Sequence, residues 1–150
     1  MKRSKTIVKH RKRIALIAHN NKKEELLTWA QEHRQQLFEH KLYSTASTGR
    51  MLEQGLNIKI KKYESGPLGG DLQIGAKIVE KKVDILIFFW DPLEAQPHDP
   101  DVKALLRTAV VWDIPMACSA ATASFILSSP MMRERYVHVA PNYNPEHLQI

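Results

Sequence analysis

Short apolar runs alternate along the chain with segments whose apolar residues recur at helical spacing. The clearest run spans Ile85 to Trp90, and an earlier one spans residues 13–19. Uninterrupted runs of this kind are typical of strands that are buried on both faces of a parallel sheet. The segment 20–39 instead spaces its apolar residues so that they share one helical face, namely Leu26, Leu27, Trp29, Ala30, Leu37 and Phe38. The domain is therefore predicted to open with a strand followed by a helix.

The same alternation continues to residue 127. We expect strands at 13–19, 42–44, 57–63, 83–90 and 115–119, and helices at 20–39, 50–54, 72–82, 102–112 and 122–127. Each right-handed crossover between parallel strands lays its helix against the sheet, so helices cover both faces. We predict an α/β fold, a three-layer α/β/α sandwich around a central five-stranded, mainly parallel sheet. Residues 136–140 are a candidate for an additional strand.

Length and composition predict one cytoplasmic domain over residues 13–150. The 150 residues are 43% hydrophobic and 25% charged, which is ordinary for a single globular domain. No apolar run approaches the roughly 20 residues of a membrane span, and residues 1–12 do not resemble a secretory signal. The single cysteine, Cys118, lies in an apolar stretch and is interpreted as a buried structural thiol, with a nucleophilic role as the weaker alternative.

The basic charge is concentrated at the N-terminus. The chain has 22 basic and 16 acidic residues; seven of the basic ones and no acidic one lie in residues 1–13, which leaves 15 against 16, a net charge of −1, for the rest. We therefore interpret residues 1–12 as a flexible basic extension. A tether to RNA or to an anionic membrane is the alternative, although no aromatic residue is interleaved for base stacking. We expect no nucleic-acid or membrane partner.

Polar segments follow four successive predicted strands. They are His19, the cluster at 45–48, Ser65 and Gly66 with Asp71, and the segment 91–101. The carboxyl ends of parallel strands meet at one edge of a sheet, where open α/β folds place their ligands. These side chains are therefore expected to converge on one site.

The polar cluster at 45–48 suits a phosphate group. Thr45, Ser47 and Thr48 supply hydroxyls, and the helix that follows supplies unpaired N–H groups at the positive end of its dipole. Lys23, one turn beyond His19, could add a cation. Simple helix caps and a solvated lysine are the alternatives. Glycines at 66, 69 and 70 let the backbone approach a ligand closely, although they would equally suit a flexible connector.

Asp71 and His98 are the candidates for acid–base chemistry. Asp71 opens a predicted helix, where it is either a cap or, if its carboxylate faces the site, a general base. His98 lies between prolines, and Asp99 and Asp101 are close enough in sequence to orient its ring; a surface histidine is the alternative. No HxH or HExxH spacing is present, so a metal site is not favoured.

These motifs together resemble the methylglyoxal synthase family. The resemblance rests on Ala18-His19 with Lys23, on residues 45–49 and 65–71, and on the long block 83–107, and it covers residues 13–130. It implies a cytoplasmic lyase that converts dihydroxyacetone phosphate to methylglyoxal and inorganic phosphate, a bypass of glycolysis, without metal or other cofactor. It also implies a homohexamer and phosphate as a candidate inhibitor.

The resemblance implies a role for each candidate residue. Asp71 would be the general base that forms an enediol(ate), His98 supported by Asp101 would move protons between the oxygens, and His19 would lie beside the carbonyl. The phosphate would be held by Lys23, Thr45, Ala46, Ser47, Thr48, Ser65 and Gly66. Two departures are Asn20 and Ser47, where the family usually has aspartate and threonine. The resemblance also implies that a phosphate contact which relatives draw from a C-terminal arginine would be missing here, since no arginine follows Arg135.

A non-catalytic function is the competing class. The same fold serves as an effector-binding module in carbamoyl phosphate synthetase, where a phosphate site can be kept without the base. The presence of Asp71, His98 and Asp101 together favours the enzyme.

Overall fold

A five-stranded parallel sheet forms the centre of the computed structural model, which describes residues 5–141. Its strand order is β4-β3-β2-β5-β6, and every neighbouring pair is parallel. The strands are β2 (Arg13–Ala18), β3 (Lys41–Ser44), β4 (Ile60–Lys62), β5 (Ile85–Phe89) and β6 (Met116–Ala117). The predicted strand positions and the parallel sheet are confirmed.

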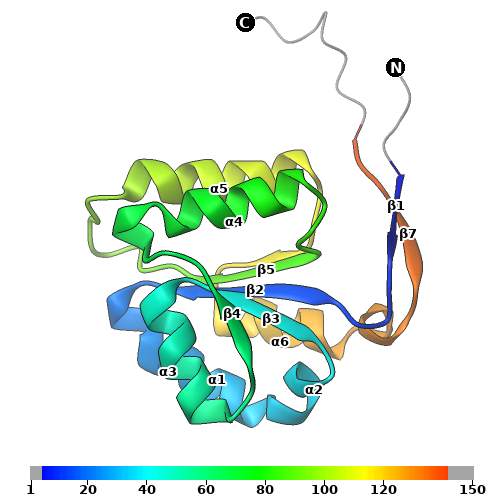
Figure 1. The fold of residues 1–150 in the computed structure, drawn as a ribbon, viewed down its shortest axis with the longest axis horizontal. Helices are drawn as coiled ribbons and strands as arrows, with labels where there is room; N and C mark the ends of the chain where they lie inside the picture. The colour runs from blue at the N-terminus through cyan, green and yellow to red at the C-terminus, as the bar shows by residue number, and fades with distance from the viewer. Residues whose placement is uncertain (1–4, 142–150) are drawn as a thin grey trace, which may run out of the picture.

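Helices cover both faces of the sheet (Figure 1). One face carries α4 (Gly70–Val79) and α5 (Asp99–Val111); the other carries α1 (Lys23–Glu32), α2 (Arg34–Phe38), α3 (Ala46–Leu56) and α6 (Ala120–Ser128). Short 3-10 helices lie at η1 (Asn20–Lys22), η2 (Gly66–Leu68) and η3 (Pro130–Arg133). The predicted three-layer α/β/α sandwich is therefore confirmed.

Strand β2 shows why its sequence is an uninterrupted apolar run. Ile14 and Leu16 pack into the core beneath α1, α3 and α6, whereas Ala15 and Ile17 pack against α4 and α5. Side chains alternate between the two faces of a strand, so a strand covered on both faces needs apolar residues at every position. Strand β5 is buried at all of its positions for the same reason.

The helix predicted at 20–39 is broken in the structure. It consists of η1, α1 and α2, with His33 between the two α-helices. The apolar face is also narrower than predicted, because Leu27 is only partly buried and Phe38 is 62% exposed. The Arg34 guanidinium instead lies over the Phe38 ring, with its central carbon 5.7 Å from the centre of that ring. The periodic pattern predicted the buried face of this segment for most positions, but it could not show that the helix is interrupted at His33.

The prediction of a flexible extension over residues 1–12 was wrong for residues 5–12. Strand β1 (Lys5–Val8) pairs antiparallel with β7 (Tyr136–Val139), and the two form a separate ribbon beside the sandwich (Figure 1). Lys12 is buried, and its Nζ donates hydrogen bonds to the carbonyls of Lys9 and Glu134. Residues 136–140 therefore supply an additional strand, but outside the main sheet. Residues 1–4 and 142–150, which include Asn142 to Pro145, lie outside the described residues.

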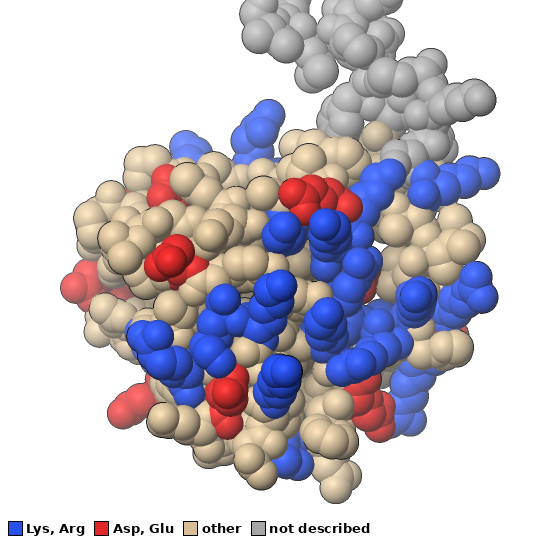
Figure 2. All heavy atoms as spheres, in the orientation of Figure 1, with Lys and Arg blue, Asp and Glu red and all other residues tan. Residues whose placement is uncertain are grey.

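Basic side chains are not confined to the N-terminus. Figure 2 shows Lys and Arg gathered over the face on which β4 forms the edge of the sheet. Among the described residues, Lys62 pairs with Glu53 and Lys77 with Glu80. In residues 5–141, no helix combines the length and the apolar character needed to cross a membrane.

Candidate active site

A cavity of about 220 Å³ lies at the carboxyl end of the parallel sheet. It opens between β2 and β5, where the strand order reverses: β3 and β4 follow on one side of β2, and β5 and β6 lie on the other. Open α/β sheets bind ligands at such a switch point, because the loops after the two central strands diverge there. The segments after β2, β3, β4 and β5 all contribute to the cavity wall, as the sequence predicts.

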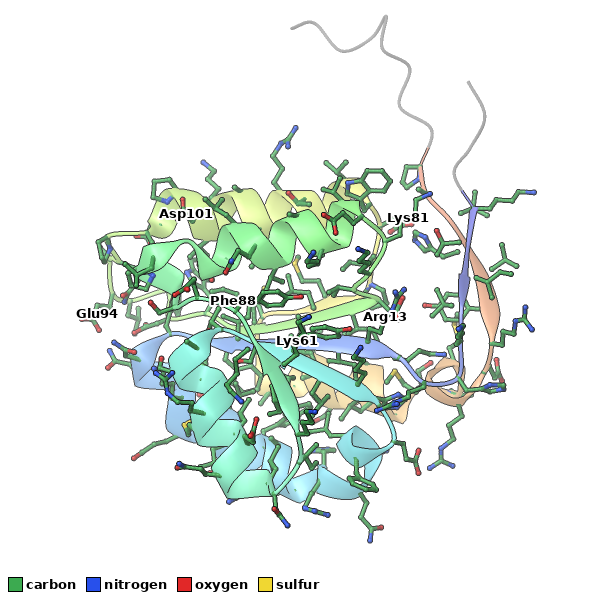
Figure 3. All side chains as sticks on the ribbon, in the orientation of Figure 1. Arg13, Lys61, Lys81, Phe88, Glu94 and Asp101 are labelled. Carbon is green, nitrogen blue, oxygen red and sulfur yellow. The ribbon has the colours of Figure 1, made fainter. Side chains whose placement is uncertain are left out.

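The structure brings most of the predicted site residues together. The cavity is lined by His19, Lys23, Thr45, Ser47, Thr48, Ser65, Gly66, Asp71 and His98. Ala46 is not among the lining residues, and its N–H donates to the Glu64 carbonyl. Asp101 is also absent from the lining; Figure 3 shows it near the start of α5. Whether either residue contributes to binding or catalysis stays a prediction.

His19 is held as a neutral donor that faces the cavity. Its Nδ1 accepts a hydrogen bond of 3.0 Å from the backbone N–H of Asp91, so the ring proton must be on Nε2. The buried Nε2 has no protein partner among the described residues. Burial lowers the pKa of His19, and the neighbouring His98 lowers it further. The ring can therefore donate a hydrogen bond to a ligand oxygen without becoming a cation.

Asp71 is a buried carboxylate that faces His98. Only 1% of its side chain is exposed, and its Oδ2 lies 3.8 Å from Nε2 of His98 with no hydrogen-bond partner in the part of the chain that is described. Burial raises the pKa of Asp71, the His98 ring lowers it, and the charge of Asp101 raises it again. A carboxyl group with a raised pKa is a stronger base once ionised. The helix cap of α4 is Gly69, so the alternative of Asp71 as a simple cap is wrong.

The aspartates near His98 do not hold its ring as predicted. Asp99 accepts a hydrogen bond from the backbone N–H of Gln96, and the N–H of Asp101 donates to the His98 carbonyl. Nδ1 of His98 is buried and has no partner within residues 5–141. Both aspartates therefore shape the loop and the start of α5, and the influence of Asp101 reaches Asp71 through charge rather than through contact.

Two glycines allow the loop after β4 to pass close to this pair. A Cβ at Gly66 would lie 2.9 Å from Nε2 of His98, and one at Gly70 would lie 1.9 Å from the Glu64 carbonyl oxygen. Gly69 adopts a left-handed conformation (φ 101°), which few other residues tolerate. The glycine-rich segment is therefore a tightly packed support for Asp71 rather than a flexible connector.

The wall of the cavity also combines a helix N-terminus with a cation. The first turn of α3 leaves N–H groups of Ser47 and Thr48 without intrahelical partners, and the Thr45 side chain makes no capping hydrogen bond. Lys23 donates to Oγ of Ser47 at 2.8 Å. Burial lowers the pKa of Lys23, and Arg50 nearby lowers it further, so positive charge is concentrated here. Such an arrangement suits an anion, and phosphate in particular.

Some residues of the wall were not predicted. Phe88, Gln96, Pro67 and Pro97 also line the cavity. The strict alternation of β5 could have placed Phe88 on the α4 side, where Figure 3 shows it, but nothing in the sequence marks Gln96. Cys118 is half-buried rather than fully buried, and burial raises the pKa of its thiol, which does not favour a nucleophile. Among the described residues, no three His, Cys, Asp or Glu side chains are grouped to hold a metal ion.

These features define a class of protein, an α/β domain with a cavity that suits an anion and holds a buried carboxylate beside a histidine. The comparisons with known proteins specify it further. The family model described as the MGS-like domain matches residues 25–118. A methylglyoxal synthase of Coxiella burnetii is 59% identical over 132 residues, which is 88% of this chain and 92% of that protein. One of Saccharophagus degradans is 55% identical over 133 residues, covering 89% and 86%.

A solved structure agrees with these relatives. The crystal structure of methylglyoxal synthase from Elizabethkingia anophelis NUHP1 matches with a TM-score of 0.88 and 51% sequence identity, over 94% of this chain and 93% of that chain. The chain therefore belongs to the methylglyoxal synthase family. The resemblance inferred from the motifs is confirmed, and so is the prediction that the protein is an enzyme of that family, a lyase.

Proposed function

We propose that this protein converts dihydroxyacetone phosphate to methylglyoxal and inorganic phosphate, with Asp71 as the general base. The observation that carries the proposal is that one cavity combines a buried carboxylate and two histidines with a helix N-terminus and Lys23. A three-carbon phosphate ester offers matching groups: a phosphate for the α3 end, and a carbonyl beside an acidic C–H bond for the Asp71 end.

The reaction would proceed in two bond-breaking steps. The Asp71 carboxylate removes a proton from the hydroxymethyl carbon, and the electron pair of that C–H bond moves to the carbonyl oxygen to give an enediolate. Nε2–H of His19 donates to that oxygen, and His98, 3.8 Å from Asp71, can return a proton to it or take one from the neighbouring hydroxyl. The electrons then expel phosphate from the third carbon, and the resulting enol takes a proton there to become methylglyoxal.

The phosphate end of the cavity would decide the fate of the enediolate. Elimination requires the bond from carbon to the phosphate oxygen to stand perpendicular to the π system, whereas isomerisation requires it to lie in the plane. The α3 N-terminus and Lys23 line the same cavity as Asp71 and would hold the phosphate in the perpendicular pose. Product analysis tests this part: glyceraldehyde 3-phosphate as a major product would overturn it.

Asp71→Asn tests the base. The variant keeps the size of the side chain but loses the proton acceptor, so we expect turnover of dihydroxyacetone phosphate to fall about 10²–10⁴-fold. Binding of inorganic phosphate, measured by calorimetry, should stay within about threefold of the original, because the anion site is built from other residues.

Asp113→Asn is the matched control. Asp113 is exposed and adopts a left-handed conformation that asparagine also tolerates, so this variant should keep full turnover. Unchanged turnover in Asp71→Asn would eliminate Asp71 as the base. Phosphate binding without turnover in the unmodified protein would instead favour the effector-binding alternative.

We also propose a homo-oligomer, a hexamer in accordance with the predicted assembly, in the cytoplasm. Trp90 and Leu93 support an assembly, because they are 41% and 94% exposed and line a shallow hollow of about 550 Å³ beside the cavity. Exposed apolar side chains in a group are typical of protein contacts. Light scattering after gel filtration should give six times the 17.2 kDa chain mass; a monomer would contradict the proposal.

A further inference from the structure

Four hydrogen bonds join the segment after β2 to the segment after β5. The backbone N–H of His19 donates to the Phe89 carbonyl at 3.2 Å, and the N–H of Asp91 donates to Nδ1 of His19 at 3.0 Å. Two residues further on, the side-chain amide of Asn21 donates to Oδ2 of Asp91 at 3.1 Å and to the carboxylate of Glu94. The contact between the two central strands is thus extended by side chains beyond the ends of the strands.

Asp91 is at the centre of this network. Its carboxylate is buried and accepts the hydrogen bond of Asn21 on one oxygen and that of the Leu93 N–H, at 3.0 Å, on the other. Both bonds lower the pKa of Asp91 and keep it ionised. They also fix the turn that directs the N–H of Asp91 at the His19 ring. If that turn relaxed, Nδ1 of His19 would lose the donor that keeps it unprotonated.

We propose that Asn21 is a positioning residue for this reaction. Its amide donates hydrogen bonds to Asp91 and Glu94 in the loop after β5, a contact that we call the clasp, and so holds His19 in the Nε2–H form. The proposal rests on the proposed function for its catalytic consequence, but the clasp itself is a property of the free protein. Asn21 does not line the cavity and is exposed, so it acts through Asp91 and not on a ligand. Figure 3 shows Glu94, its second acceptor, at the tip of the loop.

The loop that Asn21 holds also carries the opposite wall of the cavity. Gln96, Pro97 and His98 lie two to four residues after Glu94 and line the cavity. The rings of His19 and His98 meet edge to face, with centres 5.7 Å apart. The Asn21 side chain therefore adds two hydrogen bonds between the element that presents His19 and the element that presents His98. The relation of these two rings is the one on which proton transfer between two neighbouring oxygens depends.

The protonation of His19 is the property that a loosened clasp would change. In the Nε2–H form the ring is a neutral donor, and a second proton on Nδ1 would face the Asp91 N–H. Without that N–H, Nδ1 becomes free to take a proton, so the pKa of His19 should rise. The charged and titratable groups around the ring are His98, Asp99, Asp91, Lys23 and Asp71. Substitution of Asn21 by alanine replaces none of them, but it removes one of the two hydrogen bonds that lower the pKa of Asp91.

Three variants test the clasp. Asn21→Ala removes it without changing the charge. The double variant Asn21→Asp with Asp91→Asn reverses donor and acceptor and keeps the net charge; it is made and compared on a Glu94→Gln background, so that the new carboxylate at position 21 meets an amide and not the Glu94 carboxylate. Lys22→Arg is the matched control, because Lys22 lies in the same turn and pairs with Glu25, and arginine keeps the positive charge that acts on Asp91.

For Asn21→Ala we expect kcat to fall about tenfold with KM within about threefold, and the acid limb of the pH profile to move to higher pH. The double variant should regain kcat to within about threefold of the original together with its pH profile, and Lys22→Arg should behave as the original. A wild-type kcat and profile in Asn21→Ala, or a double variant no better than Asn21→Ala, would overturn the proposal.

A measurement without substrate separates this inference from the proposed function. Long-range ¹H–¹⁵N spectra of the histidine rings in the free protein at neutral pH should show His19 protonated at Nε2 alone. In Asn21→Ala the same ring should show a mixture of the two tautomers. If the protein forms no methylglyoxal but the spectra change as expected, the proposed function fails and the clasp stands. An unchanged His19 ring in Asn21→Ala would refute the clasp whatever the activity.

Discussion

His40 shows at the scale of one residue how a buried ring can make stability depend on pH. It is 5% exposed, and its Nδ1 accepts a hydrogen bond of 2.9 Å from the backbone N–H of Lys12. Burial lowers the pKa of His40; Glu39 acts in the opposite direction, and Lys12 and Arg11 lower the pKa further. A protonated ring could not accept this hydrogen bond on Nδ1, so the folded state favours the neutral form.

The sign of the effect follows from linkage. Because the folded state has the lower pKa, the unfolded state binds the proton more readily, and the stabilisation is complete only above the unfolded value of about 6.5. It is lost progressively as pH falls from there through the folded-state pKa. His19 acts in the same direction, whereas Asp71, whose pKa is raised, favours the folded state at low pH and loses that contribution as pH rises. A single-residue variant is needed to isolate the part of His40.

We predict that His40→Asn is less sensitive to acid than the original protein. The asparagine carbonyl can accept the hydrogen bond of Lys12 but does not titrate. Urea unfolding between pH 8 and pH 5 should therefore show a difference in free energy between the two proteins that changes with pH below about 6.5, by at most about 1.4 kcal/mol per pH unit. A difference that is constant over this range would contradict the assignment.

At the same scale, the sequence predicted which side chains belong to the candidate site better than it predicted their hydrogen bonds. Asp71, His98 and the hydroxyls at 45–48 could be assigned to one site, because each follows a strand whose position the apolar runs fixed. The tautomer of His19 could not be predicted, since its partner is the N–H of Asp91, 72 positions further along the chain. Asn21 was missed for the same reason, because its partners Asp91 and Glu94 come into contact with it only after β2 and β5 have paired.

At the scale of the element, helix α4 contains two glycines that differ in how much room their surroundings leave for a side chain. Gly70 opens the helix, and a Cβ there would lie 1.9 Å from the backbone carbonyl oxygen of Glu64. That oxygen cannot move aside as the end of a flexible side chain would. Gly75 lies mid-helix, and a Cβ there would be 3.7 Å from the Leu105 side chain, an ordinary contact.

We predict that Gly70→Ala and Gly75→Ala change stability in opposite directions. Gly70→Ala should cost about 1–3 kcal/mol, because the loop after β4 must shift, and it should lower activity further by moving Asp71, the next residue. Gly75→Ala should be neutral or stabilise the protein by up to about 1 kcal/mol, because alanine is the better helix former. Urea unfolding and turnover of both variants check this. Equal costs would show that the close approach at Gly70 is not rigid.

Elements with a strong periodic pattern were predicted closely, and those defined by distant pairing were not. The apolar runs located β2 and β5 because both faces of each strand are buried. Strand β1 has a mixed, basic sequence, and what makes it a strand is its pairing with β7, which joins Lys5 to Val139 at the other end of the chain. No local pattern reports that pairing, so the segment was interpreted as a flexible extension.

At the scale of the whole molecule, Lys12 links the β1–β7 ribbon to the sandwich. It is 1% exposed, its Nζ donates to the carbonyls of Lys9 and Glu134, and it lies 5.1 Å from the centre of the Tyr136 ring. Burial lowers the pKa of Lys12, and the charges of Asp84 and Glu134 raise it. One side chain thus connects the turn before β2, the end of η3 and the start of β7. We therefore expect the attachment of the ribbon to depend on it.

Lys12→Ala should loosen the ribbon more than the rest of the molecule. The two carbonyls lose their donor, which should cost about 1–3 kcal/mol, and backbone amides of β1 and β7 should exchange with deuterium sooner than those of β2 and β5. Lys9→Ala is the matched control, because Lys9 contributes only its carbonyl to this contact. Its stability should stay within about 0.5 kcal/mol of the original. Exchange that accelerates equally in the ribbon and in the central sheet would mean that Lys12 supports the whole fold, since the ribbon would then not open separately.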